Sequence, residues 1–143
     1  MLTFSEILAF IEELVQQVFG SSASPGFTWG RSGATPADTW LLNDSVPSNK
    51  SGRTVFLTSA LIKKVFIANE DAVILSVDVY YHEGNEVGLT LLGTVTTAAA
   101  RTNEFNVAFS VPQGKQIALK ISAASANAAK NIVAGILMSG NLV

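Results

Sequence analysis

The first part of the chain has hydrophobic residues at the spacing of an amphipathic helix. Between Thr3 and Phe19 the apolar positions lie three or four residues apart, as on one face of an α-helix. The residues of this seam are Phe4, Ile7, Leu8, Ile11, Leu14, Val15 and Val18. Thr3 and Glu6 have the spacing of a capping box, and Gly20 is suited to end the helix. We therefore expect one N-terminal amphipathic helix within residues 1–22.

The apolar side of this helix needs a cover, because a helix of this length is marginal alone in water. Three covers are open: the helix folds back on its own domain, joins copies of itself in a short bundle, or docks on a different protein. Its polar side carries Glu and Gln without Lys or Arg, which argues against a membrane-surface role. The candidate residues for an oligomer or partner interface are Phe4, Ile7, Ile11, Leu14 and Val18.

Residues 23–38 differ in composition from the helix and indicate an extended arm. Ser, Gly, Ala, Pro and Thr are frequent there, as is typical of linkers. Phe27 and Trp29 lie within this segment, and large aromatic side chains are unfavourable in water. We expect both to anchor the arm, either on the chain's own domain or on a neighbouring subunit, and we include them among the candidate interface residues.

After the arm, hydrophobic and polar residues alternate at the two-residue period of β-strands. The clearest predicted strands are Val73–Tyr81, Val87–Thr96, Phe105–Val111 and Gln116–Ala123. The segment Asn131–Met138 is apolar on both faces, which is typical of a central or interface strand. Weaker patterns indicate strands at Thr39–Asn43, Arg53–Thr58 and Leu61–Ala68.

Turn residues separate these segments, and the sequence shows no second helical pattern. The predicted turns are at 44–52, 69–71, 83–86 and 112–114. Seven to eight short strands with regular turns predict a mainly β chain folded as an antiparallel β-sandwich, and we favour a jelly roll. The expected organisation is a helix (1–22), an arm (23–38) and a sandwich domain (39–143).

Composition adds that the surface is poor in charge. Asp, Glu, Lys and Arg make up 14% of the 143 residues, and the formal net charge is −2. Soluble domains typically contain roughly 25% charged residues, so electrostatic repulsion between molecules is weak here, which suits a protein packed in an assembly. The Lys and Arg residues are scattered, so we expect no nucleic acid partner. We expect no membrane association either, and synthesis in the cytoplasm.

Residues that carry catalysis or bind metals are scarce. The sequence has no cysteine, and its single histidine, His82, is predicted on the polar face at a strand end, where it would be solvated beside a turn. A zinc-protease motif would need a second histidine at position 86, which is Glu86. No serine stands in a Gly-x-Ser-x-Gly motif. We therefore expect no enzyme activity, no catalytic residues, no metal and no cofactor.

Two acidic turns and four aromatic residues allow alternative interpretations. The turns at 69–71 and 83–86 contain oxygen ligands that suit calcium, although ordinary turn chemistry explains them more simply. Trp29, Trp40, Tyr80 and Tyr81 are of the type that stacks on sugar rings. A packing role is the simpler interpretation for these aromatics, since Tyr81 falls on a core-facing position and Trp40 begins a strand.

A series of short motifs runs from Thr28 to the C-terminus. They are Thr28-Trp29-Gly30-Arg31-Ser32-Gly33, Trp40-Leu41-Leu42-Asn43, Val46-Pro47-Ser48-Asn49, Ile62-Lys63-Lys64-Val65-Phe66-Ile67-Ala68-Asn69-Glu70, Asp78-Val79-Tyr80-Tyr81-His82-Glu83-Gly84 and Gly114-Lys115-Gln116-Ile117-Ala118. In these motifs the chain resembles small virion structural proteins of tailed bacteriophages. The resemblance implies a β-sandwich that serves as a capsid cement or decoration module, or as the head of a fibre, with the N-terminal segment as the attachment device.

These features together predict a non-catalytic virion structural protein. The first hypothesis is a capsid decoration protein whose helix and arm bridge neighbouring subunits, while the sandwich sits on the outer surface of the shell. Such a protein would form a homo-oligomer, dimer or trimer, and would bind the major capsid protein. The alternative is a fibre or spike head that binds a host receptor or glycan, and a degenerate enzyme is a third, since fold does not fix function.

Overall fold

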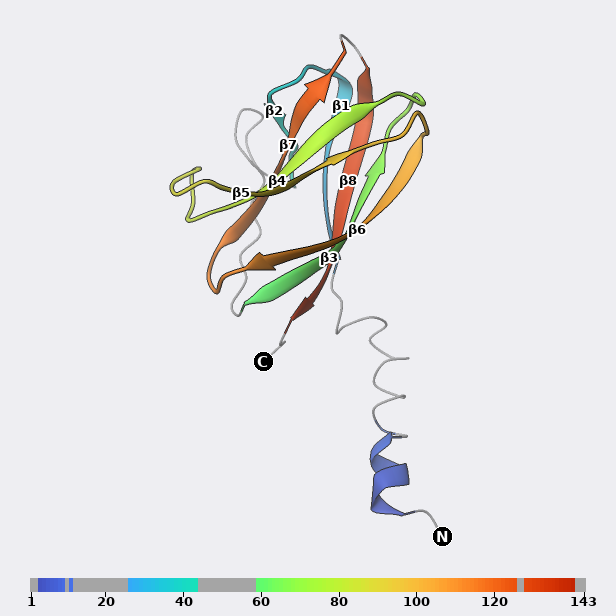
Figure 1. Ribbon diagram of the computed structural model, residues 1–143, viewed down its shortest axis with the longest axis vertical. Helices are drawn as coiled ribbons and strands as arrows, with labels where there is room; N and C mark the ends of the chain where they lie inside the picture. The colour runs from blue at the N-terminus through green and yellow to red at the C-terminus, as the bar shows by residue number, and fades with distance from the viewer. Residues whose placement is uncertain (1–2, 10, 12–25, 44–58, 126–127, 141–143) are drawn as a thin grey trace.

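A computed structural model gives the architecture of the chain and describes residues 3–9, 11, 26–43, 59–125 and 128–140. Residues 4–9 and 11 are helical. The strands, shown in Figure 1, are β1 (Gly26–Thr35), β2 (Thr39–Trp40), β3 (Ala60–Ala68), β4 (Leu75–His82), β5 (Thr90–Thr96), β6 (Thr102–Val111), β7 (Gln116–Ala124) and β8 (Ala129–Gly140).

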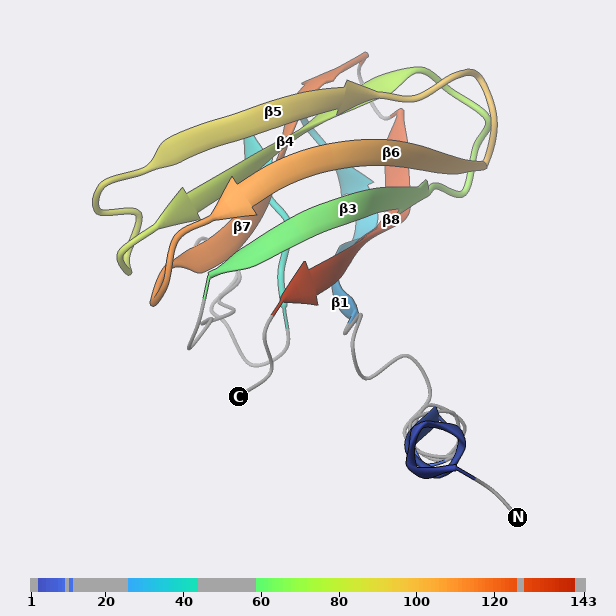
Figure 2. The same cartoon turned by 60° about the horizontal axis from the view of Figure 1, so that its bottom comes forward.

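The strands form two four-stranded antiparallel sheets that face each other (Figure 2). One sheet has the order β1-β8-β3-β6 and the other β2-β7-β4-β5. Within this order β1 pairs with β8, β2 with β7, β3 with β6 and β4 with β5, so the strands pair from the outermost to the innermost. An eight-stranded double sheet with this nested pairing is a jelly roll. The predicted mainly β sandwich is thereby confirmed.

The predicted strands from Val73 onward are all present, with differences of a few residues at their ends. Leu61–Ala68 corresponds to β3. Thr39–Asn43 is shorter than expected, because only Thr39–Trp40 pairs as a strand and Leu42 adds an isolated bridge to Gly30. The strand predicted at Arg53–Thr58 and the turn at 44–52 lie outside the described residues, as does the helix beyond Ile11.

The segment expected to be an extended arm contains a strand of the sandwich. Gly26–Thr35 forms β1, which runs antiparallel to β8 with Trp29 opposite Ala134. On the edge of β8 that faces away from β3, the backbone N–H and C=O groups need hydrogen-bond partners, and β1 supplies them. Frequent glycine and serine residues hide the alternation of β1, although Phe27 and Trp29 have the two-residue spacing of a strand. The sandwich therefore begins before Thr39, which is the start that the sequence predicted.

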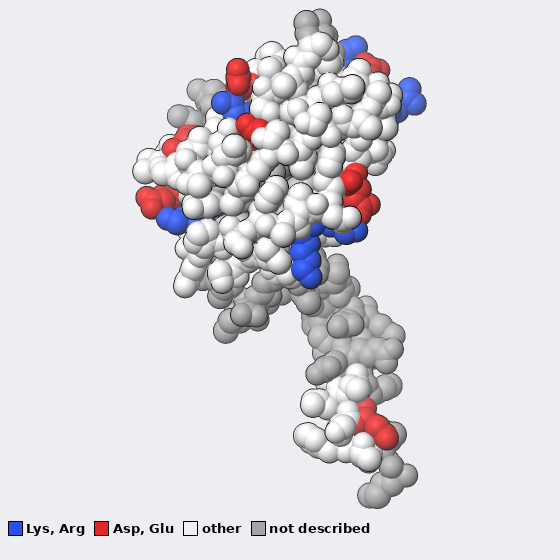
Figure 3. Space-filling view, viewed as in Figure 1, with Lys and Arg blue, Asp and Glu red and all other residues white. Residues whose placement is uncertain are grey.

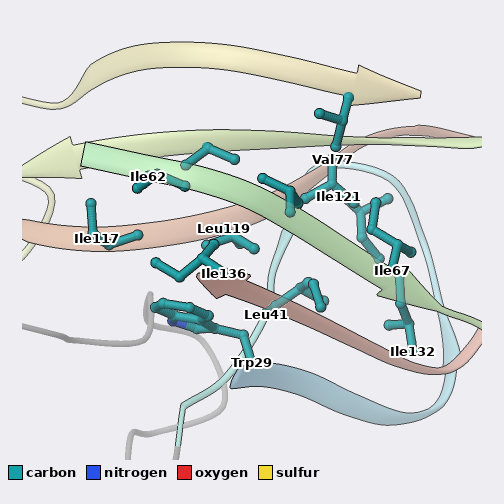
Figure 4. Close-up of a cluster of buried hydrophobic side chains, with 14 of the residues drawn as sticks. Trp29, Leu41, Ile62, Ile67, Val77, Ile117, Leu119, Ile121, Ile132 and Ile136 are labelled. Atoms are coloured by element: carbon teal, nitrogen blue, oxygen red, sulfur yellow. The ribbon is translucent and has the colours of Figure 1, made fainter. Parts of the chain in front are cut away.

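The hydrophobic core lies between the two sheets (Figure 4). In β4, Leu75, Val77 and Val79 are buried, while Asp78 and Tyr80 are half-buried on the opposite face. The other strands contribute large aliphatic side chains in the same way, among them Ile62, Ile67, Ile117, Leu119, Ile121, Ile132 and Ile136. The alternation in sequence thus becomes an apolar inner face and a mixed outer face for each sheet.

Candidate interaction surfaces

The N-terminal helix begins with the predicted capping box. The backbone N–H of Thr3 donates to Glu6 Oε2 at 3.3 Å, and the N–H of Glu6 donates to Thr3 Oγ1 at 3.2 Å. The N–H of Ile7 then donates to the Thr3 carbonyl at 3.1 Å, closing the first turn. Because these bonds satisfy N–H groups that have no partner within the helix, they stabilise its start.

The apolar seam of this helix is uncovered. Phe4 is 80% exposed, and Ile7, Leu8 and Ile11 are between 43% and 49% exposed. Figures 1 and 2 both place the helix beyond one end of the sandwich, away from the two sheets. The described part of the sandwich therefore leaves the seam accessible. Of the predicted interface residues on the helix, Leu14 and Val18 lie outside the described residues.

The outer face of the β1-β8-β3-β6 sheet carries an apolar groove with a volume of 280 Å³. Its floor is at Gly135 on β8, which lies opposite Thr28 of β1 and Phe66 of β3. Val133 and Leu137 lie two residues to either side of Gly135, so they share its face. The missing side chain at Gly135 leaves a depression between the larger neighbours. We call these five residues, Thr28, Phe66, Val133, Gly135 and Leu137, the sheet groove.

The sheet groove is apolar and partly open to solvent. Val133 is 48% exposed, and Phe66 and Leu137 are half-buried. Two charged residues lie beside the groove, Lys64 opposite Leu137 and Glu104 opposite Phe66, and they form an ion pair with each other. Strand β8 is apolar on both faces, and within the described part of the chain no second layer lies over this side of it (Figure 2). The two apolar faces of this strand are visible in the sequence, but the groove is not.

The rest of the surface bears few charges. On the face seen in Figure 3, charged side chains are scattered, often in pairs of opposite sign, and broad uncharged areas separate them. The described ion pairs are Lys64–Glu104, Lys115–Glu83, Lys120–Asp38 and Lys130–Asp71. Most of these side chains are well exposed to solvent, so each pair contributes little to stability.

Trp29 is a core residue, which corrects its assignment to an oligomer interface. It is only 1% exposed and packs between the sheets, with Ile117, Leu119 and Ile136 nearby in Figure 4. The reason is that β1 belongs to the sheet, so alternate side chains of the supposed arm point inward. Phe27 is partly buried against the same core and also borders the sheet groove. Of the two alternatives left open for these aromatics, anchoring on the chain's own domain is the one observed.

His82 is fully buried, whereas the sequence predicted a solvated side chain. Its position on the outer face follows the expected alternation, opposite Gln116 of β7. However, β4 is an interior strand between β7 and β5, and the turn that follows it contacts the ring. His82 Nδ1 accepts a hydrogen bond from the N–H of Gly84 at 3.1 Å. The histidine therefore fixes a turn and is inaccessible to a substrate.

The acidic turns are held by internal hydrogen bonds. The side-chain amide of Asn69, which is buried, donates to the carbonyls of Asp71 and Ala128, and its oxygen accepts from the N–H of Lys130. In the second turn, Lys115 lowers the pKa of Glu83 through a 2.8 Å hydrogen bond and its positive charge. Among the residues that the structure describes, no group of three or more potential ligands is arranged to hold a metal ion.

On the outer face of the other sheet, aromatic and polar side chains contact one another. The rings of Trp40 and Tyr80 meet edge to face at 5.5 Å, and Lys120 Nζ lies 5.3 Å from the Trp40 ring centre. The Tyr80 hydroxyl donates to Asp78 Oδ2 at 2.9 Å, and the Thr94 hydroxyl donates to Oδ1 at 2.5 Å. Burial, together with Asp78, raises the pKa of Tyr80. Both oxygens of Asp78 thus accept internal hydrogen bonds, and the cluster packs these strands together.

The comparisons with known proteins agree with the fold alone. No family model matches the sequence, and no curated protein matches it. The globular domain of zebrafish complement 1qA protein is similar at 8% identity and a TM-score of 0.46, covering 81% of this chain and 96% of that chain. A carbohydrate-binding module from Cellvibrio mixtus lichenase 5A, solved with cellotriose, has 16% identity, a TM-score of 0.41 and coverage of 84% and 88%.

A viral structure is also among the similar folds. A chain of infectious bursal disease virus, Gx strain, has 18% identity and a TM-score of 0.36, and the match covers 86% of this chain but 34% of that one. The nested pairing of the eight strands defines the class of the chain as a jelly-roll β-sandwich, and this fold by itself does not fix a function. In the described part of the chain, no helix has the length and hydrophobicity needed to span a membrane.

Proposed function

We propose that this chain is a non-catalytic virion structural protein of a tailed bacteriophage that decorates the capsid and attaches through its N-terminal helix. The observation that carries this proposal is the exposed seam of Phe4, Ile7, Leu8 and Ile11 on a capped helix at the end of a compact sandwich. An amphipathic helix of this kind is stable when a protein surface covers its apolar side. The motif resemblance to phage virion proteins indicates the kind of assembly.

The free energy gained by burying the seam decides whether the helix alone can hold the chain on the shell. Fully burying a large apolar side chain contributes about 1.5–3 kcal/mol, and the four seam residues already have part of their surface covered. Their complete burial is therefore worth roughly 4–6 kcal/mol. Association of two proteins costs about 4–15 kcal/mol in lost freedom of motion. The helix thus needs further contacts, and many copies on a regular shell supply them together.

The charge-poor sandwich supports an assembled rather than a freely dissolved state. With few charges, repulsion between neighbouring copies is weak, and we propose that the chain forms homo-oligomers that contact the major capsid protein. A non-catalytic role is supported by the chemistry of the chain, because it has no cysteine and its single histidine is fully buried. In this proposal the chain is synthesised in the host cytoplasm and becomes part of the virion.

The test is binding of the full-length protein to purified capsids of the phage that encodes it. In the seam variant, Ile7 and Ile11 are both replaced by glutamate. In the matched control, Ser5 and Ala9, exposed residues on the other side of the same helix, are replaced by glutamate. Both variants have the same added charge. We expect co-sedimentation with capsids to fall at least tenfold for the seam variant and to persist for the control.

Equal binding of the seam variant and the wild type would refute attachment through the helix. Gold labelling of intact particles separates decoration from the alternative function. Label over the shell supports a decoration protein, whereas label confined to the fibre tips would assign the chain to a fibre or spike head that binds a host receptor or glycan.

A further inference from the structure

We propose that the sheet groove of one chain receives the N-terminal helix seam of a second copy of the same chain. This inference rests on the proposed attachment role of the helix and names the surface that covers the seam, which is a neighbouring copy in the layer on the shell. Each chain carries two uncovered apolar surfaces, the seam and the groove, and both are partly exposed. The two surfaces come from segments far apart in the sequence, so each is apolar and exposed independently of the other.

The depression at Gly135 has room for a side chain of a helix that lies over the sheet. Thr28 and Phe66 lie on the strands to either side of Gly135, and Val133 and Leu137 lie two residues before and after it. Adjacent strands are about 4.8 Å apart, so the backbones of β1 and β3 are roughly 10 Å apart. A side chain of the seam can enter between these four residues, because Gly135 has no side chain of its own.

The groove and the described part of the seam have comparable lengths. From Val133 to Leu137 the strand β8 advances about 13 Å, at roughly 3.3 Å for each residue. From Phe4 to Ile11 a helix advances about 10.5 Å, at about 1.5 Å for each residue. The four seam residues that the structure describes can therefore lie over the length of the groove.

The chemistry of the two surfaces is complementary. Large aliphatic and aromatic side chains stand out from the helix, and the groove offers an apolar lining with a depression in its centre. The charges at the rim, Lys64 and Glu104, pair with each other, so covering the groove buries no isolated charge. Glu6 lies on the other side of the helix, in its capping box, and stays in solvent.

A second copy is the occupant that the arrangement favours. Figures 1 and 2 show the helix directed away from the sandwich of its own chain, and Val133 in the groove is 48% exposed. The chain's own helix therefore does not fill its groove. Because each copy presents one seam and one groove, two copies can exchange helices reciprocally in a closed dimer, or the contact can pass from copy to copy into a ring or an array. Either arrangement covers the seam of every copy.

The experiment measures the oligomeric state of full-length variants by sedimentation velocity over a range of concentrations. Ile7→Glu disables the seam, and Val133→Glu disables the groove. Leu91→Glu is the matched control, because Leu91 is 51% exposed, close to the value for Val133, but lies on β5 of the other sheet. We expect self-association of the wild type and the control, and at least a tenfold weaker association of the other two variants.

Mixing the two disabled variants gives the decisive result. The Val133→Glu chain keeps its seam and the Ile7→Glu chain keeps its groove, so together we expect them to form a one-to-one complex that neither forms alone. Gly135→Leu, which fills the depression, should act like Val133→Glu. Thermal unfolding of each variant checks that loss of association is not loss of fold.

Several outcomes would overturn the inference. If the wild type is a monomer at all concentrations, no second copy binds. If Val133→Glu and Gly135→Leu associate normally while Ile7→Glu does not, the helices bind one another, and the groove is not their site. In both cases capsid binding through the helix would still stand. Failure of the proposed function itself is recognised separately, by capsid binding that is insensitive to the seam variant.

Discussion

Two strand glycines are expected to respond to alanine in opposite directions. Gly93 lies on β5, and a Cβ atom added there would stand 2.5 Å from Cζ and 2.7 Å from Cε1 of Phe109, on β6 of the other sheet. At Gly135 the added Cβ would meet only the Phe27 carbonyl oxygen at 3.4 Å and a Thr28 methyl at 3.6 Å. The first position is closed to a methyl group, and the second accepts one.

The magnitudes follow from two opposing effects. Glycine within a strand is less favourable than alanine by about 0.5–1 kcal/mol, because its unfolded chain has more freedom. Gly135→Ala should therefore raise the free energy of unfolding by roughly this amount. At Gly93 the clash with Phe109 adds an overpacking cost of about 1–3 kcal/mol. The net effect of Gly93→Ala is a loss of up to about 2.5 kcal/mol.

Urea denaturation followed by circular dichroism measures these differences. The critical comparison is Gly93→Ala in the background of Phe109→Leu, whose shorter side chain removes the two closest atoms. There the alanine should become neutral or stabilising, because only the gain from the unfolded state is left. If Gly93→Ala is equally destabilising with Leu at position 109, the two effects are additive and the proposed contact is wrong.

Three further predictions concern buried and paired groups. Trp29→Ala should lower the free energy of unfolding by about 3–5 kcal/mol in urea denaturation, because it empties a large space in the core. Asn69→Ala should cost about 1–3 kcal/mol, because its buried backbone partners lose their hydrogen bonds, whereas the exposed Asn106→Ala should change stability by less than about 0.5 kcal/mol. The pKa of Glu83, followed by NMR, should lie below that of a free glutamate because Lys115 pairs with it, and Lys115→Met should return this pKa to the ordinary value. Since the pKa is lowered in the folded state, the contribution of the pair to folding stability is present at neutral pH. This contribution is lost as the pH falls through the lowered pKa.

The local elements of this chain were predictable because short-range chemistry controls them. The capping box of Thr3 and Glu6 depends on residues three apart, and the structure contains both of its hydrogen bonds. The strands from Val73 onward were predictable from their alternation, since a strand with one face in a core repeats every two residues. The segment around Trp29 was missed because glycine and serine interrupt this alternation, although the strand is held by its neighbour β8.

The functional surfaces required more than local patterns. The sequence identified the helix seam, because its described residues, Phe4, Ile7, Leu8 and Ile11, belong to one helix. It gave no means of finding the sheet groove, since Thr28, Phe66 and Gly135 become neighbours only through the pairing of three strands. His82 was misjudged for a related reason: alternation predicts which face a residue lies on, but not what covers that face.

By itself, the sequence determined the capped amphipathic helix, most of the strands, the mainly β class and the scarcity of catalytic groups. Hydrophobic periodicity and capping act over a few residues and are therefore visible in the chain. The tertiary structure alone decided that β1 completes the sandwich, that Trp29 and His82 are buried, and that a glycine between Thr28 and Phe66 opens a groove. These properties depend on which distant strands pair and what packs over them, because hydrogen bonding and burial across a jelly roll join residues that are far apart in the sequence.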